Sequence, residues 1–367
     1  MTLTKFKPLL HRYFTLILGV GFWGCESDSL LNQDSNGECI PQVLTGDFSI
    51  RSVRDVVALE RKGGCSYSIA GDLAITQVTR SSLEGLSDLT TISGDLSIFE
   101  NEDLENFKGL ADLTTIGGTV HIHSNEKLEV IEDMFIQTVG GDVNIHHNEM
   151  LVDLAVIAKL TNVGGHIHVH NNNMLKDVED IYNLERVSGD FIIEYNPAFN
   201  LIEDLSRLQY VGGNFIIENN YSLEVIEKIS NLQYVGGNVH IGRNATLDRV
   251  ENMNGLTRVV GDLLIYDNGR LTNLVGFAQL KNVGGNFSLY ANKKLTNLRG
   301  FEMLSEVDGD FNMYDNDRLS DITSLIKLIK VEGNFFVIDN GNLLTEDVRK
   351  LADQFVPNKI TILDNKN

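Results

Sequence analysis

Residues 139–151 read VGGDVNIHHNEML, and the chain repeats this stretch at a fixed interval. Residues 163–175 read VGGHIHVHNNNML, and residues 283–295 read VGGNFSLYANKKL. The copies begin every 24 residues, with one interval of 23, at Ile92, Ile116, Val139, Val163, Val187, Val211, Val235, Val259, Val283, Val307 and Val331. A fixed period in this range is typical of a solenoid, in which each coil packs only against its neighbours.

Within one coil, each position has its own chemical character when the first Val or Ile is counted as position 0. Position 2 is glycine in every copy, which indicates either a positive φ or a close approach between the backbones of neighbouring coils. Positions 4 and 6 are apolar and position 5 is mostly polar, as in Val143–Asn144–Ile145, which predicts a strand with one buried face. Positions 12 and 15 are apolar as well and complete the predicted core of the coil.

Position 9 is asparagine in eleven consecutive copies, from Asn101 to Asn340. An amide side chain both donates and accepts hydrogen bonds, so a stack of asparagines can satisfy the backbone where each coil turns a corner. Calcium binding is the alternative, but calcium prefers carboxylates alternating with carbonyl oxygens. The uniform asparagine therefore favours a structural stack.

These patterns predict an all-β fold, a right-handed parallel β-helix or solenoid of about 12–13 coils that covers residues 39–367. Atypical copies at residues 39–91 and 341–367 are predicted to cap its two ends. At the first end Val78 stands where asparagine belongs. At the second, Thr345 is expected to N-cap a short helix that precedes a strand at Ile360–Leu363.

The first 24 residues have the features of a signal peptide. Lys5, Lys7 and Arg12 precede an apolar stretch that is too short to span a bilayer. The segment ends in Gly24–Cys25, which resembles a bacterial lipoprotein signal, so lipidation of Cys25 is expected. Ordinary secretion and a retained anchor are the alternatives. Residues 25–38 are predicted to be a polar tether, and the expected location is the outer membrane or cell surface.

Composition limits the partners and the compartment. Beyond the signal peptide and Cys25, only Cys39 and Cys65 remain, which suits an oxidising compartment and a single disulfide at the first coil. A redox or metal role for these two cysteines is the less favoured alternative. The net charge of −21 argues against nucleic acid, whose phosphates need a basic surface. It equally disfavours electrostatic docking on an anionic membrane.

The recurring pattern GDLxI…N…L…L…GL…L…VGG resembles the receptor L-domain, the β-helical module of insulin- and EGF-receptor ectodomains, and more closely the fungal GPI-anchored cell-wall organisation proteins. The opening is similar too, with Cys39, Asp47–Ile50 and then Cys65 before Gly71–Asp72. The similarity runs from about Cys39 to Asn365. It implies a β-helical fold and binding at a cell surface or wall organisation, and it supplies no catalytic motif.

Histidines are concentrated in three consecutive coils, on the outward positions 5 and 7. These five candidates are His121, His123, His146, His168 and His170, and His166 adds position 3. Side chains at this separation on adjacent strands could converge on Zn²⁺, Cu²⁺ or Ni²⁺, with Glu194 as a neighbouring carboxylate. The alternative is a stack of neutral surface histidines that repeat duplication has propagated.

Tyrosines occupy position 7 in three later coils, at Tyr266, Tyr290 and Tyr314. Such a row could be a stacking platform for sugar rings or for a partner protein, because exposed aromatic residues anchor interfaces. Alternatively, the row stabilises the sheet by itself.

Taken together, the sequence favours a non-enzymatic, surface-anchored binding or structural module for a glycan, a wall polymer or a protein. An envelope metal-binding protein that uses the histidines with Zn or Cu is one alternative. A β-helical polysaccharide lyase is the other, but such an enzyme needs a Lys or Arg base on the sheet face. Positions 5 and 7 carry neither residue from Ile92 onward, and a fold alone does not imply activity.

Overall fold

The structure is a computed structural model, and it describes residues 34, 37–131, 134–178, 181–202 and 204–366. The predicted signal peptide of residues 1–24, the predicted lipidation site Cys25 and most of the predicted tether at 25–38 lie outside the described residues.

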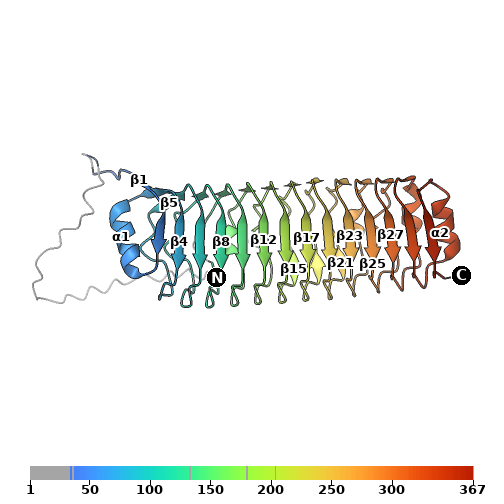
Figure 1. Ribbon diagram of the computed structural model, residues 1–367, viewed down its shortest axis with the longest axis horizontal. Helices are drawn as coiled ribbons and strands as arrows, with labels where there is room; N and C mark the ends of the chain where they lie inside the picture. The colour runs from blue at the N-terminus through green and yellow to red at the C-terminus, as the bar shows by residue number, and fades with distance from the viewer. Residues whose placement is uncertain (1–33, 35–36, 132–133, 179–180, 203, 367) are drawn as a thin grey trace, which may run out of the picture.

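The chain forms a straight rod of stacked coils, with the strands running across its long axis (Figure 1). Three parallel sheets run along the rod, and each coil contributes one strand to the two long ones. We name these two the wide sheet, of fourteen strands, and the narrow sheet, of thirteen. The third sheet has three strands, β15 (Leu201–Ile202), β18 (Val225–Ile226) and β21 (Arg249–Val250).

The wide sheet consists of β2 (Phe48–Ile50), β4 (Leu73–Thr76), β6 (Leu96–Phe99), β8 (Val120–His123), β10 (Val143–His146), β12 (Ile167–His170), β14 (Phe191–Glu194), β17 (Phe215–Glu218), β20 (Val239–Gly242), β23 (Leu263–Tyr266), β25 (Phe287–Tyr290), β27 (Phe311–Tyr314), β29 (Phe335–Ile338) and β30 (Ile360–Leu363). The narrow sheet consists of β1 (Gln42–Thr45), β3 (Tyr67–Ala70), β5 (Leu89–Ile92), β7 (Thr115–Ile116), β9 (Thr138–Val139), β11 (Asn162–Val163), β13 (Arg186–Val187), β16 (Tyr210–Val211), β19 (Tyr234–Val235), β22 (Arg258–Val259), β24 (Asn282–Val283), β26 (Glu306–Val307) and β28 (Lys330–Val331). Short 3₁₀ helices lie at η2 (Ala155–Ile157), η4 (Val275–Phe277) and η5 (Thr323–Lys327).

Equivalent positions of successive coils pair directly, as the sequence period predicts. Val143 pairs with Ile167 and His146 pairs with His170, one repeat further on. In the four-residue strands the first and third residues are buried, and the second and fourth face outward. The parallel β-solenoid and its outward rows are therefore confirmed.

Aliphatic and aromatic ladders fill the interior of the rod. Val143, Ile145 and Leu151 are completely buried, as are their equivalents in the neighbouring coils. Toward the C-terminal end the core changes from aliphatic to aromatic, and Phe287, Phe311 and Phe335 stack with centroids 4.8 and 5.1 Å apart. Burial of this apolar surface is the main stabilising contribution to the rod.

The asparagines at position 9 form the predicted stack. Asn148 is completely buried, and its Nδ2 donates to the carbonyl oxygens of Ile122 and His146 and to Oδ1 of Asn172. Its backbone N–H donates to Asn172 Oδ1 at 3.1 Å. The stack ends at Asn101, whose Oδ1 accepts from the backbone N–H of Val78 at 3.0 Å. Val78 occupies the asparagine position of its coil, so this coil provides the last hydrogen-bonding partner of the stack but adds no asparagine to it.

A second polar ladder, at position 3, was not predicted. The carboxylate or amide oxygen of this residue accepts from the backbone N–H of position 3 in the next coil, as Asp142 Oδ1 does from His166 N at 2.7 Å. The same bond links Asn214 to Asn238 and Asp310 to Asn334. Each coil is thus tied to the next at both corners of the wide sheet.

The glycines at position 2 allow close contact between coils. A Cβ atom on Gly141 would lie 2.8 Å from the carbonyl carbon of Gly118. Of the two explanations for these glycines, close backbone approach therefore applies to Gly141, whose φ is not positive. The left-handed backbone lies instead at position 8, where Ala291 has a φ of 56°.

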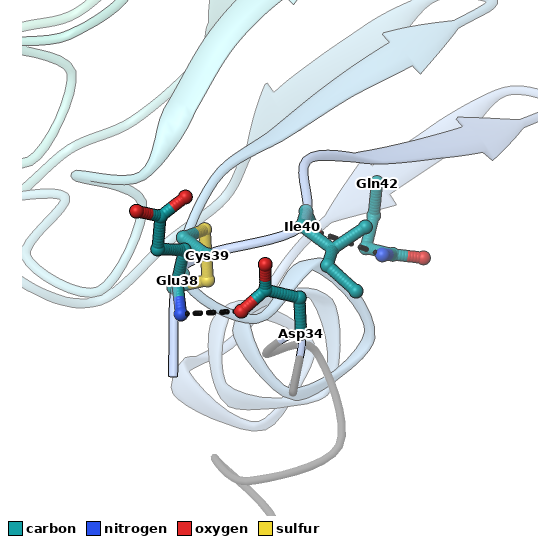
Figure 2. The surroundings of a disulfide bond; sticks show 6 residues. Asp34, Glu38, Cys39, Ile40 and Gln42 are labelled. Carbon is teal, nitrogen blue, oxygen red and sulfur yellow. Dashed lines mark hydrogen bonds between the residues drawn. A yellow bond between two sulfur atoms is a disulfide. The ribbon is translucent and has the colours of Figure 1, made fainter. Parts of the chain in front are cut away.

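A helix and a disulfide close the N-terminal end of the rod. Helix α1 (Val53–Gly63) packs Val56 and Leu59 onto the first coils, and it was not predicted although these residues share one helical face. The expected disulfide joins Cys39 and Cys65, two residues that flank this helix. Figure 2 shows the bridge beside Glu38, whose backbone N–H donates to the Asp34 carboxylate at 2.9 Å.

Helix α2 (Thr345–Ala352) and strand β30 close the C-terminal end, as predicted (Figure 1). The predicted N-cap is wrong by one residue, because Leu344 holds that place and no side chain caps the helix. The backbone N–H of Thr345 donates to Lys366 O at 2.8 Å instead, so the final turn of the chain satisfies it. Neither this helix nor any other among the described residues has the length and apolar character needed to cross a bilayer.

Candidate functional site

Tyr266, Tyr290 and Tyr314 end three neighbouring strands of the wide sheet, and the structure brings them into one ladder. The rings of Tyr290 and Tyr314 stack with centroids 4.6 Å apart and planes inclined by 7°. Tyr266 lies 5.2 Å from Tyr290 and is tilted by 31°. The row that the sequence predicts is therefore continuous.

The tilt of Tyr266 follows from a missing side chain one coil earlier. Gly242 holds position 7 there, and a Cβ on it would collide with the ring of Tyr266. The tyrosine fills this gap and forms a hydrogen bond with Glu218, two coils back. As a result Tyr266 is only 7% exposed, and the Arg243 guanidinium lies 5.3 Å from its ring centroid.

An open cavity of about 490 Å³ lies along this ladder, at the corner that follows the wide sheet. The three tyrosines form one wall. The other lining residues come from positions 8 and 10 of the coils, and all but Ala291 are charged: Arg243, Asp267, Lys293, Asp315 and Asp317. The site therefore combines phenol hydroxyls with carboxylates and cations.

All three phenols have raised pKa values and stay protonated at neutral pH. Burial is the main cause for each tyrosine. The charge of Glu218 adds to the rise in the pKa of Tyr266, and that of Asp315 adds to the rise for Tyr314. The Tyr266 hydroxyl already donates to Glu218, and the hydroxyls of Tyr290 and Tyr314 are bonded to each other, so Tyr314 keeps a free donor and the phenol oxygens can accept further bonds.

The stacking direction decides which part of each ring is available. The coils are about 4.8 Å apart, so rings in register stack along the rod and cover one another's faces. The edges of the rings are left to line the cavity, while the Tyr266 hydroxyl is bonded to Glu218. The cavity is consequently a row of hydrogen-bonding groups on an aromatic wall.

The histidines form a second ladder on the same sheet. The rings of His123 and His146 are 4.8 Å apart with planes inclined by 2°, and His146 and His170 are 4.7 Å apart at 11°. Phe99 continues the stack beyond His123 at 5.2 Å. His147 packs edge-on against two of these rings.

This geometry does not support the predicted metal site. The lone pair of an imidazole nitrogen lies in the ring plane, so the parallel rings of the stack direct their nitrogens side by side and not toward one point. Nδ1 of His146 does lie 2.9 Å from Nδ1 of His147, but among the described residues no third ligand joins this pair. Nδ1 of His121 lies 3.4 Å from Nδ2 of Asn144, and Nε2 of His168 lies 3.0 Å from Oε1 of Glu194. Within the described ranges, no three His, Cys, Asp or Glu side chains are grouped so that they could hold a metal ion.

His166 has a structural place. Its Nδ1 accepts from the backbone N–H of Asp190 at 2.9 Å, the bond that Asp or Asn makes at position 3 in most other coils. The ladder at position 3 therefore accounts for this histidine, which the sequence grouped with the metal candidates.

Sequence reasoning missed the charged half of the cavity. Arg243, Asp267 and Asp315 occupy position 8, and Lys293 and Asp317 occupy position 10. The available signal was the left-handed corner before each asparagine, which directs position 8 outward beside position 7. Because position 8 varies freely in residue type, the sequence alone did not mark it.

One comparison with known proteins gives a match. The family model of the receptor L domain matches residues 64–154, which include His123 and His146 but not the tyrosine cavity. None of the curated proteins matches this sequence. Over residues 64–154 the chain is thus similar to the receptor L domain, a family of generally non-catalytic binding domains, and the same parallel coils continue to the C-terminal cap.

Proposed function

We propose that this protein is a non-enzymatic binding module, exported to the cell surface, whose tyrosine cavity binds a neutral glycan. The observation that carries the proposal is the alignment of three tyrosines with three carboxylates and two cations along one open cavity. A sugar presents hydroxyl groups that both donate and accept. Carboxylates and phenol oxygens accept from such groups, and Arg243 and Lys293 donate to them.

The size of the cavity supports a glycan over a protein. A volume of about 490 Å³ is within the range of small-ligand sites. A stable protein partner would instead cover roughly 800 Å² on each side. The cavity is open along the rod, so it can accept several rings of an extended wall polymer.

Two features support a binding role over catalysis. The matched family is generally non-catalytic. The lining carboxylates Asp267, Asp315 and Asp317 belong to two corners of the solenoid that are two coils apart, and no histidine or cysteine is among the residues that line the cavity.

Isothermal titration calorimetry with cellohexaose, laminarihexaose and chitohexaose tests the proposal. At least one oligosaccharide is expected to bind, and Tyr314→Ala should weaken that binding about tenfold, equivalent to ~1.4 kcal/mol. Tyr221→Ala is the matched control, because Tyr221 is 53% exposed and lies outside the cavity. Binding by none of the three, or equal binding by folded Tyr314→Ala, would contradict the proposal.

We also propose that Cys25 anchors the module to a membrane through a lipid. The disulfide supports an oxidising, extracellular location. Expression of the full chain in a bacterium that processes lipoproteins should give a membrane-bound product, and Cys25→Ala should release it into the soluble fraction. Mass spectrometry of the mature N-terminus distinguishes lipidation from ordinary secretion, which would leave both proteins soluble and unmodified.

A further inference from the structure

A second aromatic ladder lies on the narrow sheet, on a different face from the tyrosine cavity. Tyr210 and Tyr234 occupy the outward residue of β16 and β19, and their rings stack with centroids 4.9 Å apart at 8°. Arg186 and Arg258 hold the same position in the coils before and after them. The row thus reads Arg–Tyr–Tyr–Arg along the rod.

The two ends of this ladder differ. The Arg186 guanidinium lies 3.6 Å from the ring centroid of Tyr210 and covers its outer face. Arg258 instead extends forward, with Nη2 3.5 Å from the place that a Cβ of Gly284 would take, one coil beyond. Tyr234 is 41% exposed, in agreement with a ring face that no arginine covers. Tyr234 therefore has a ring face that no arginine covers, and the Arg258 guanidinium lies further along the same row.

The charge of this strip is opposite to that of the whole protein. Its outward residues in the five coils from Val187 to Val283 include three cations and one anion, namely Arg186, Arg258, Lys281 and Glu185. The full chain carries −21. Of the acidic groups at the adjoining corner, Asp262 Oδ1 accepts the backbone N–H of Asn286 and Asp190 Oδ1 that of Asn214. Both carboxylates are therefore part of the hydrogen-bonded ladder at position 3.

We propose that Tyr234 and Arg258 form a binding site for a carboxylated sugar, such as a uronate residue of an acidic polysaccharide. The apolar face of the sugar ring packs on the open face of Tyr234, and the guanidinium of Arg258 binds the ring carboxylate through two parallel N–H···O bonds. Glycines at positions 212 and 236 leave the strip flat beside the rings, so an extended chain can lie along it. The site does not depend on the tyrosine cavity.

Calorimetry with tetragalacturonate, at low and high NaCl, tests this site on the full mature protein. Wild type is expected to bind, with weaker binding at high salt. Tyr234→Ala and Arg258→Gln should each weaken the affinity at least about tenfold. Arg299→Gln is the charge-matched control, because Arg299 is exposed and lies outside the strip, and Tyr314→Ala tests independence from the cavity. Both should bind as wild type does.

The inference would be overturned by no binding of tetragalacturonate by wild type, by unchanged affinity in Tyr234→Ala and Arg258→Gln, or by an equal loss in Arg299→Gln. A tetraglutamate peptide that competes as well as tetragalacturonate would also overturn it, because charge alone would then explain the affinity. Loss of binding in Tyr314→Ala alone would assign the acidic sugar to the cavity instead.

Discussion

At the scale of single residues, the rod depends on side chains that serve two coils at once. The side-chain amide of Asn148 donates hydrogen bonds to backbone carbonyls of its own coil and of the previous coil. Its backbone N–H donates to Oδ1 of Asn172 in the next coil. Gly141 contributes by having no side chain where two backbones meet. Neither role depends on what the protein binds, so substitutions here should change stability and leave ligand affinity of the folded protein unchanged.

Asn148→Ala should lower the free energy of unfolding by about 2–4 kcal/mol. The substitution removes one donor each from the carbonyl oxygens of Ile122 and His146, and it removes the Oδ1 acceptor of the Asn125 N–H groups. Urea unfolding followed by circular dichroism measures the change. Asn144→Ala is the control, because Asn144 is on the outward face, and a similar loss for both variants would argue against the stack.

Gly141→Ala should destabilise the protein by about 1–3 kcal/mol, because a methyl group would press on the Gly118 backbone. Gly269→Ala is a matched control in the same fold. A Cβ on Gly269 would meet nothing closer than 4.0 Å, so this change should be neutral or stabilise by up to about 1 kcal/mol. Thermal unfolding of the two variants checks the difference, and equal melting temperatures would refute the proposed role of close approach.

At the scale of elements, strands in register turn each outward position into a ladder. The histidine and tyrosine ladders of the wide sheet and the Arg–Tyr–Tyr–Arg row of the narrow sheet all arise in this way. A ladder concentrates one chemistry and also couples its members. In the histidine ladder, this coupling contributes to the lowered pKa values of the half-buried His146 and His170.

Burial, together with repulsion from the neighbouring imidazoles, lowers the pKa of both His146 and His170 to about 4. A lowered histidine pKa means that the unfolded chain binds protons more tightly than the folded one. The stability contributed by these groups is therefore full above pH ~6.5 and is lost as the pH falls toward 4. Protein melting temperature should drop over this window.

The double variant His146→Gln, His170→Gln isolates this contribution from that of the carboxylates. Its melting temperature should fall less than that of wild type between pH 7 and pH 4.5. The groups that face these rings are His123, His147 and His168, and they remain in both proteins. Parallel curves for the two proteins would show that the ladder does not titrate as described.

At the scale of the whole molecule, the rod is a one-dimensional array whose exposed ends must be closed. Helix α1 and the disulfide cover one end, and α2 with β30 cover the other (Figure 1). Each coil is stabilised mainly by its neighbours, so loss of a cap should first affect the coils next to it.

Replacing both cysteines, Cys39→Ser with Cys65→Ser, should lower stability by about 3 kcal/mol on the chain-entropy account. Hydrogen exchange should accelerate first in β1 and α1, while the central coils stay protected. Urea unfolding and exchange mass spectrometry check both parts. Uniform acceleration along the rod would contradict an end cap and indicate one cooperative unit.

The sequence by itself determined the period, the parallel register, the buried and outward positions, the asparagine stack and the cysteine pair. These follow from the repeat, because in-register pairing places equal positions on top of one another. The row of Tyr266, Tyr290 and Tyr314 and the block of histidines could be named for the same reason.

Only the tertiary structure decided what those rows can do. It turned the stacked histidine rings parallel, so that their nitrogens do not converge. It let the Tyr266 side chain lean across Gly242 to Glu218. It also placed Arg243 and Lys293 beside the tyrosines. It also covered the first coil with α1 and directed Arg258 away from Tyr234. The physical reason is that a repeat specifies the backbone, whereas ring orientation, corner geometry and rotamers depend on which side chains occupy the neighbouring coils.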